Sequence, residues 1–444
     1  ISMFYFLKLQ IQSAKINIIV PSKTGHVQVV NGPLRFCKRI SSFLPSRQKT
    51  GYVQQLIFRT RSKGDDRVLE ARWDGRVVKR LLAATDEDTD LQSIVREAVS
   101  LKQLEPDDYP IHFFEVELVK PRRIANDRLL NEVEIETFIG QVCPCPFSPE
   151  FSYRKEIADL LSSHGRAGRT YHIHINGSET PVYRPHRDEV AFSESKKSAF
   201  HSLKPFSIEG IDGEMAAVGW LIHHDYQGAI PVSQGVRGLR ARVGNIQIGH
   251  DRLFAEIFPE DRFCSWSVGE VHILDPRVVP NGRRDEFENN AHLDNIMAHL
   301  RPIGAEVARE CRVSSQKRNR MKLFELAADK VYERLDVLKQ GAVSERYAKT
   351  IKAETGTLLS EMRKATEFDL FEEQERGTLR QQLRMIEKEV DSQATRTEGD
   401  VLGGLPTLKR AVYKEVIDLI YDCSANQVAA KSLIDRMLAR LSRS

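Results

Sequence analysis

Long apolar runs are absent from this 444-residue sequence. No stretch approaches the roughly 20 apolar residues that a membrane-spanning helix requires, so no membrane association is expected. The first residues, ISMFYFLKLQIQ, hold a short apolar patch broken by Lys8 and no small-residue cleavage site, so they do not predict a signal peptide. The sequence begins with Ile rather than Met. We therefore expect a fragment of a longer protein, with an important part missing from the front.

Cysteine is sparse. The six cysteines stand at positions 37, 143, 145, 264, 311 and 423, which is neither a disulfide framework nor a paired set of zinc ligands. The sequence therefore predicts a reduced, cytoplasmic protein without a metal site. Cys143 and Cys145 form the one close pair, and proline-locked backbone with buried thiols explains it as well as metal binding does. His172 and His174 share one strand face without a carboxylate or thiol at ligand spacing, so we expect hydrogen-bonded or solvent-facing histidines.

A strong charge of either sign is also absent. The net charge is +4, with 41% hydrophobic and 29% charged residues, and this near-neutral balance makes no case for nucleic acid. The length of 444 residues predicts roughly two to four domains. The basic run RVSSQKRNRMK at 312–322 lacks interleaved aromatic residues, so we interpret it as a solvated helix start or linker. The glycines of GVRGLRARVG lack the spacing of a dinucleotide fingerprint and the Lys-Ser/Thr of a phosphate loop, and turns explain them more simply.

The apolar pattern predicts an α+β chain of four regions. Residues 1–63 alternate short apolar strings with Gly, Pro and Ser, which favours short strands of unassigned role. Residues 64–205 mix strands and helices, with YHIHI and TPVY as a hairpin about an Asn-Gly turn and a polar connection or irregular edge at 184–204. Residues 206–311 form a compact α/β module with strands such as AAVGWLIHH and SVGEVHIL, and with LFAEIF as a helix.

Residues 312–444 contain almost no strand pattern and are predicted to be helical. Apolar residues recur at helical or heptad spacing in two runs, Phe324, Ala328, Val331, Leu335 and Leu338, then Leu379, Leu383, Ile386 and Val390. Each run lasts only about two heptads, which favours a packed bundle or helical hairpins over a long coiled coil. Because apolar stripes need a partner, we also expect a homodimer formed through the helices after Pro406.

The most informative stretch is residues 269–311, where a strand runs into an Asn-Gly turn, two arginines and a long helix. A guanidinium at such a junction is held by backbone on both sides, and its planar, permanently charged fork suits phosphate oxygens. Arg283 and Arg284 are the candidates. The alternative is that they cap local carbonyls or pair with Asp285 and Glu286.

The same stretch carries a family resemblance. Pro259-Glu260, then Gly269-x-Val271, then Asn281-x-x-Arg284, in an almost gapless order from residue 239, resemble the middle domain of the ninety-kilodalton heat-shock chaperone family, part of the GHKL ATPase superfamily. HFFEVEL, DRLLNEVEIETFIGQV and PFSPEFS resemble segments of bacterial ATP-binding proteins similar to this chaperone.

The resemblance implies a role for each residue of the turn. It implies that Arg284 contacts the γ-phosphate of ATP and is catalytic, with Asn281, Arg283 and Glu288 beside it in the cofactor site. Glu288 stands where the chaperones usually carry Gln, and Gly282-Arg283 replaces an aliphatic-Ser pair.

The resemblance also implies a fold and a division of labour. It implies that 206–311 is a transducer, a ribosomal-protein-like sheet backed by helices. A GHKL nucleotide-binding domain needs a helix with a metal-holding Asn and a catalytic Glu, a D-x-G-x-G adenine site and a glycine-rich lid, and no such set appears in order. We therefore expect ATP and Mg to be bound by a missing upstream domain, and this chain to be an ATPase only together with it.

Two classes of function follow. The first is the middle and C-terminal part of an ATP-driven chaperone that acts on client proteins. The second is a non-catalytic interaction scaffold that keeps the transducer fold. Within the first class, a DNA-associated GHKL ATPase of the MutL or microrchidia kind is a further alternative, because it shares the same two-domain engine.

Overall fold

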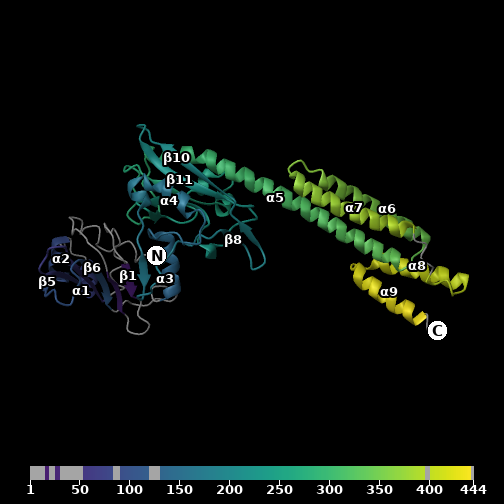
Figure 1. Cartoon of the computed structure of the whole chain (residues 1–444). Coiled ribbons are helices and arrows are strands. Elements are labelled where there is room, and N and C mark those ends of the chain that lie inside the picture. Colours follow the sequence, from purple (N-terminus) through teal and green to yellow (C-terminus); the bar gives the residue numbers. More distant parts are fainter. Residues whose placement is uncertain are drawn as a thin grey trace. The chain divides into compact units, whose positions relative to one another are not determined.

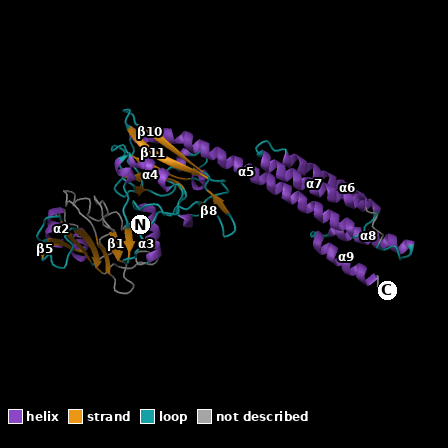
Figure 2. Ribbon diagram, in the orientation of Figure 1, coloured by secondary structure: helices purple, strands orange, loops and turns teal. Residues whose placement is uncertain are grey.

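The computed structural model describes residues 16–19, 26–30, 54–83, 91–119, 131–395 and 401–441. The chain divides into two compact units, Ile1–Cys311 and Arg312–Ser444. In the described residues, the first unit mixes sheets and helices and the second is helical, which confirms the predicted fold class (Figure 2).

A seven-stranded sheet occupies the N-terminal part of the first unit. Its order is β5-β4-β3-β6-β2-β1-β7, antiparallel except for the parallel pair β1 and β7. The strands are β1 Ile16–Ile19, β2 His26–Val30, β3 Gln55–Arg61, β4 Val68–Asp74, β5 Val99–Leu104, β6 Phe113–Val119 and β7 Ile173–Ile175 (Figure 1). Strands from both sides of residue 63 therefore share one sheet.

Four helices accompany this sheet and the chain that follows it. They are α1 Gly75–Ala83, α2 Leu91–Ala98, α3 Glu132–Val142 and α4 Arg154–Ser162. The Asp74 carboxylate accepts from the backbone N–H of Arg76 at 2.8 Å, which satisfies a free donor at the start of α1. Asn131 caps α3 in the same way, and the proline after Cys143 prevents α3 from continuing.

The predicted Asn-Gly turn forms, but the predicted hairpin does not. Asn176 and Gly177 both have positive φ, at 50° and 72°, and the Ser178 N–H donates to the Ile175 carbonyl at 2.9 Å. Only β7 is a strand, however, and its strand partner is β1. The TPVY segment is held by single hydrogen bonds such as Val182 N–H to Ile173 O at 2.7 Å.

A five-stranded sheet forms the rest of the first unit. Its order is β10-β11-β14-β12-β13, with β12 parallel to β14 and the other pairs antiparallel. The strands are β10 Ser202–Glu209, β11 Met215–His223, β12 Gly238–Val243, β13 Ile246–Ile248 and β14 Val268–Ile273, and β8 Glu189–Ala191 pairs with β9 Lys197–Ala199 beside them.

One expectation for this region was right only in part, and another was wrong. The stretch 184–204, expected to be a connection or irregular edge, contains β8, β9 and the start of β10; β10 is an edge strand and therefore tolerates Pro205. LFAEIF, expected to be a helix, forms only a 3₁₀ turn over Ala255–Ile257. Phe258 precedes a proline and is extended, which ends the turn.

The five-stranded sheet is covered on both faces. One face packs Leu239, Ala241 and Val271 against Ile296 and Leu300 of helix α5 (Ala291–Lys339). On the other face, apolar residues of β11 pack against α4 and Phe151 in a second cluster, formed by Val218, Trp220, Ile222, Ile157 and Leu161. Segments from before residue 205 therefore cover one face of the sheet that follows it.

The second unit is a helical bundle. The C-terminal part of α5 packs with α6 (Glu345–Thr366) and α7 (Glu373–Thr395), and α8 (Thr407–Cys423) and α9 (Gln427–Leu441) enclose a further core with Val337 and Ile351 (Figure 1). Every apolar position predicted from the helical spacing lies in, or packs against, these cores, which confirms a bundle rather than a long coiled coil. None of the described helices has both the length and the apolar content of a membrane span.

Candidate functional site

The chain between β14 and α5 folds back on itself around the two predicted arginines. Pro280 and Phe287 face each other as an isolated antiparallel bridge, and the Asn281 N–H donates to the Glu286 carbonyl at 2.9 Å. We call residues 280–287 the arginine turn. Its backbone bonds give the two guanidinium groups a fixed base at the entry to α5.

Asn281 organises the interior of the arginine turn. Its Oδ1 accepts from the backbone N–H of Arg283 at 3.1 Å and from that of Asp285 at 3.3 Å, and its Nδ2 donates to the Asp285 carboxylate at 2.7 Å. An Asn side chain that bonds to backbone two residues on stabilises a turn. The structure therefore gives Asn281, which the sequence placed in a cofactor site, a role in shaping the turn.

Arg284 has a left-handed backbone, with φ at 56°. Its N–H donates to the Asn281 carbonyl at 3.0 Å, and its carbonyl accepts from the N–H of Gly249, the residue after β13, at 2.9 Å. A Cβ on Gly249 would lie 2.7 Å from the Asp285 carbonyl oxygen, so the glycine permits this close approach. The turn is therefore seated on the sheet.

The four predicted site residues are neighbours in the sequence and differ in exposure. Arg284 and Asn281 are half-buried, whereas Arg283 and Glu288 are exposed. Among the described residues, the Arg283 guanidinium pairs with no carboxylate, and Asp285 accepts from Asn281 instead. The local ion pair considered as an alternative is thus not formed by Arg283.

Charged side chains that sequence reasoning missed fix the base of the turn. The Asp275 carboxylate accepts from Arg277 Nε at 2.8 Å, and Arg277 also pairs with Asp212. Hydrogen bonds from Arg277 lower the pKa of Asp275. His292 Nδ1 lies 3.1 Å from Asp275 but without hydrogen-bond geometry, and Asn290 Oδ1 caps α5 by accepting from the His292 N–H at 3.0 Å. The one sequence signal was Asp-Pro-Arg directly after a strand.

Arg184, Arg242, Glu270 and His272 form a buried ion cluster on one face of the five-stranded sheet. Glu270 accepts from Arg242 Nε at 2.5 Å and from Arg184 Nη1 at 2.6 Å, and His272 Nε2 is 3.1 Å away. All four side chains are at most 1% exposed. Although burial alone acts to raise it, the two guanidinium groups hold the pKa of Glu270 well below its usual value.

The buried ion cluster binds the chain that covers the sheet. Arg242 Nη2 donates to the Gln141 carbonyl and Arg184 Nε to the Cys145 carbonyl, both at 2.9 Å. These backbone carbonyls lie outside regular sheet, so the guanidinium groups supply donors that they would otherwise lack. The available sequence signal was the charge at alternate positions of the apolar strings GLRARV and GEVHI.

The cysteine and histidine pairs have ordinary surroundings. Cys143 and Cys145 are buried, and burial raises both pKa values, that of Cys145 to about 12. His172 is exposed, and His174 Nδ1 lies 2.7 Å from the Ser178 carbonyl oxygen, in agreement with the sequence interpretation. Within the described ranges, no group of three or more His, Cys, Asp or Glu side chains is arranged to hold a metal ion.

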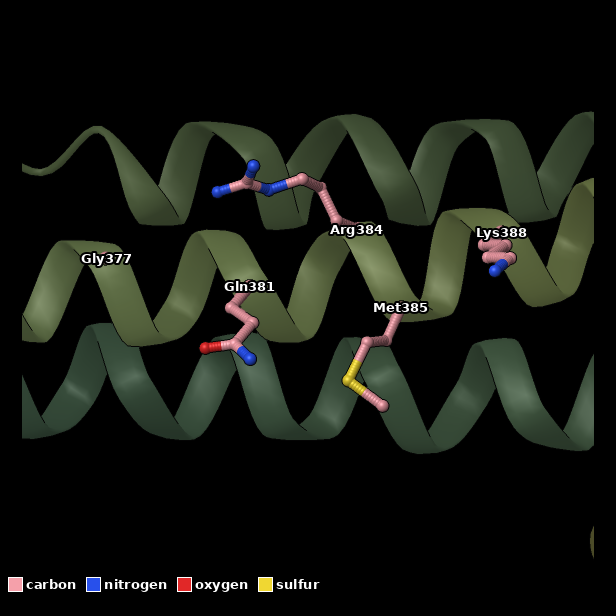
Figure 3. Close-up of a pocket in the computed structure, with 5 residues that line it drawn as sticks. All are labelled: Gly377, Gln381, Arg384, Met385 and Lys388. Carbon is pink, nitrogen blue, oxygen red and sulfur yellow. The ribbon is translucent and has the colours of Figure 1, made fainter.

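A shallow groove follows the outer side of α7. It is lined by Gly377, Gln381, Arg384, Met385 and Lys388, all from this one helix (Figure 3). Arg384 points away from Gln381 and Met385 (Figure 3). Without polar groups that converge on one point, the groove does not have the features of a ligand site.

Comparisons with known proteins give structural neighbours only. No protein-family model and no curated protein matches the sequence. The ATPase region of Saccharomyces cerevisiae topoisomerase II is similar at a TM-score of 0.33 and 9% identity, over 67% of this chain and 78% of that one. The same region bound to ICRF-187 has a TM-score of 0.32 and 8% identity, over 68% of this chain and 80% of that one.

A third neighbour has a similar score. The ATPase and transducer domains of DNA topoisomerase II from Balamuthia mandrillaris have a TM-score of 0.31 and 11% identity, over 68% of this chain and 80% of that one. Scores and identities this low assign neither a fold family nor an activity to the chain.

Proposed function

We propose that this chain carries the transducer of a GHKL-type ATPase, and that Arg284 contacts the terminal phosphate of ATP bound with Mg in another domain of the same protein. The observation that carries the proposal is the left-handed backbone of Arg284. This conformation costs a non-glycine residue about 1–3 kcal/mol and is concentrated at functional sites. Gly or Asn would adopt it at lower cost, so an arginine here supports a role for its guanidinium.

The geometry of the arginine turn suits such a role. Hydrogen bonds to Asn281 and Gly249 hold the Arg284 backbone on both sides, so the side chain starts from a fixed point. A planar guanidinium can donate two parallel hydrogen bonds to phosphate oxygens and stabilise charge that develops during phosphoryl transfer. Arg283 and Glu288 are exposed on the same segment and are proposed to line the cofactor site, with Arg283 one residue off the phosphate contact.

Two classes of ATPase fit this proposal. The first is a chaperone-like ATPase that acts on client proteins, supported by the motif order from residue 239 to Arg284. The second is a DNA-associated ATPase of the same superfamily, supported by the basic run 312–322, which lies inside α5 and includes the exposed Arg312 and Arg320. ATP turnover that is stimulated by DNA favours the second, and suppression of client aggregation favours the first.

The test uses the complete gene product. We expect Arg284→Ala to lower ATP turnover by about one to two decades, less than the three to five decades of the strongest arginine fingers, because slow closure often limits such enzymes. Arg284→Lys should rescue poorly, because an ammonium does not reproduce the planar fork. Arg283→Ala is the matched control and should have a much milder effect.

Two results would contradict the proposal. Equal losses for Arg283→Ala and Arg284→Ala would remove the special role of Arg284. A complete gene product without the metal-holding Asn, the catalytic Glu and the D-x-G-x-G motif would favour the non-catalytic scaffold instead.

We further propose that the C-terminal helices form a homodimer. Leu408, Val412, Val416 and Leu419, spaced by four, four and three residues on α8, are 81, 54, 38 and 59% exposed. A second copy of this stripe is the occupant that we propose. Light scattering should give a dimer mass for the 444-residue chain and a monomer mass for Leu408→Glu/Leu419→Glu, and equal monomer masses would contradict the dimer.

A further inference from the structure

One face of the five-stranded sheet holds more buried positive than negative charge. Arg240 and Arg242 of β12 lie on the same face as Glu270 of β14, because Arg240 is the direct parallel partner of Glu270. Arg184 and Arg242 share Glu270. Arg237, the residue before β12, pairs with Asp251, and both side chains are partly exposed. Four guanidinium groups thus meet two carboxylates.

Arg240 is the cation without a carboxylate of its own. Its Nε donates to the Arg237 carbonyl at 3.1 Å and its Nη1 to Gln247 Oε1 at 2.8 Å. Its Nη2 has no hydrogen-bond partner among the described residues, although the side chain is only 5% exposed. Burial, followed by the charge of Arg242, lowers the pKa of Arg240 to about 10, so the group is still charged at neutral pH.

Local backbone geometry holds this cation in place. A Cβ on Gly238 would lie 2.0 Å from the Asp251 carbonyl oxygen, so the glycine lets the chain at Asp251 approach β12. Gln247 is oriented by two bonds, because its Nε2 donates to the Gly249 carbonyl at 3.1 Å while its Oε1 faces Arg240. The amide oxygen occupies one donor of Arg240 and leaves Nη2 for another partner.

We infer that Arg240, with Arg237 beside it, forms a binding site for a phosphate-class oxyanion at the start of β12. A buried charge without a counter-charge is costly, and proteins normally pair it or bind an ion beside it. A tetrahedral dianion balances the two unmatched positive charges. Two of its oxygens can accept hydrogen bonds from the planar, parallel N–H donors of a guanidinium. The site is independent of the ATPase proposal, because it needs neither Arg284 nor a nucleotide.

Titration of the 444-residue chain with inorganic phosphate tests the site, at constant ionic strength set with chloride. We expect saturable binding by calorimetry in the low-millimolar range and a rise in Tm of about 2–4 °C at tenfold excess over Kd. Absence of saturable binding overturns the inference.

Three variants sharpen the test. Arg240→Gln should abolish phosphate binding and be at least as stable as the parent in chloride, because it removes an unmatched charge. Arg309→Gln, which alters a side chain that is 70% exposed, is the matched control and should bind as the parent does. Asp251→Asn removes a carboxylate beside the site and should tighten binding several-fold.

The variants also define how the inference fails. An Arg240→Gln chain that unfolds, or that binds phosphate as the parent does, overturns it. Equal loss of binding in Arg309→Gln indicates an ion atmosphere rather than a site, and overturns it as well.

A phosphate ester distinguishes the source of the oxyanion. Glycerol 3-phosphate that binds as well as inorganic phosphate assigns the site to the terminal phosphate of a larger molecule. Binding of inorganic phosphate alone assigns it to the free ion. Both results support an oxyanion site at Arg240.

Discussion

The two compact units fill their interiors with different chemistry. The first unit buries Arg184, Arg242 and Glu270 at the centre of a sheet face. Among the described residues of the second unit, the buried polar side chains are the uncharged Gln340, Thr355 and Thr366, and the rest of the core is apolar.

Backbone chemistry explains the difference. A helix satisfies its own backbone groups, so the faces that meet in the second unit need only apolar side chains. The five-stranded sheet of the first unit is covered partly by the last turn of α3 and by irregular chain, where the carbonyls of Gln141 and Cys145 have no partner in a helix or sheet ladder and require donors. Guanidinium groups supply these donors, and their charge then requires Glu270.

Removing the Glu270 charge from the buried ion cluster should give the largest loss of stability. Glu270→Gln leaves two buried guanidinium groups without a counter-charge, which we expect to destabilise the first unit by about 3–5 kcal/mol. Trp73, Trp220 and Trp266 all belong to the first unit, so tryptophan fluorescence during denaturant unfolding reports on that unit.

The control for this prediction is a pair at the surface. Lys204 and Glu306 form an ion pair whose side chains are 44 and 32% exposed, and Glu306→Gln should cost less than about 1 kcal/mol. Similar losses of stability for the two variants would show that the buried ion cluster contributes no more to stability than a surface ion pair.

Shortening an apolar side chain in the bundle core should destabilise the second unit instead. Leu335 is 1% exposed in the bundle core, and Leu335→Ala should cost about 2–5 kcal/mol through lost burial and a residual cavity. Helical ellipticity should then be lost at lower denaturant, while the tryptophan transition stays in place. Leu323→Ala, at a position that is 56% exposed, should change stability by no more than about 0.5 kcal/mol. A matching shift of the tryptophan transition would mean that the units unfold together.

Mild acid should lower the unfolding free energy of the first unit but not that of the second, without any mutation. Burial lowers the pKa of His186 to about 3 and that of His224 to about 4. The unfolded chain then binds protons first, so stability is complete above about pH 6.5 and falls as the pH drops toward the folded values. At pH 5.5 each histidine should cost the first unit about 1.4 kcal/mol relative to pH 7.5.

The second unit provides the control, because the last histidine of the chain is His299 and the unit begins at Arg312. Tryptophan fluorescence and helical ellipticity, followed in denaturant at the two pH values, should therefore diverge. His186→Gln should remove the share of His186, about 1.4 kcal/mol, from the loss in the first unit. An equal loss in both units would contradict the assignment.

The units also differ in how far sequence predicts them. The helical spacing around Leu335 and Leu383 placed those side chains in the bundle core, because each helix is specified by neighbours within a few turns. The basic run 312–322 was interpreted as a helix start or linker, yet it lies within the continuous helix α5, since a polar helix surface resembles a linker in composition.

The parts that sequence missed depend on distant residues. Arg184 and Glu270 are 86 positions apart, and no local pattern joins them. Strand β10 was missed because an edge strand need not be apolar on both faces and tolerates Pro205. The arginine turn was located by its motif, but the left-handed backbone of Arg284 and the contact with Gly249 were not predictable from that motif.

The smallest expected effect concerns that backbone. Arg284→Gly relieves a left-handed residue, so the first unit should keep its stability or gain up to about 1 kcal/mol, measured by tryptophan fluorescence of the 444-residue chain. Arg283→Gly, without such strain to relieve, should instead lose about 0.5–1 kcal/mol by unfolded-state entropy. In the complete gene product, the ATPase proposal requires Arg284→Gly to lose turnover although its fold is no less stable. A loss of stability larger than about 1 kcal/mol in Arg284→Gly would assign the guanidinium to the structure of the turn, and the strained backbone would then no longer support a phosphate contact.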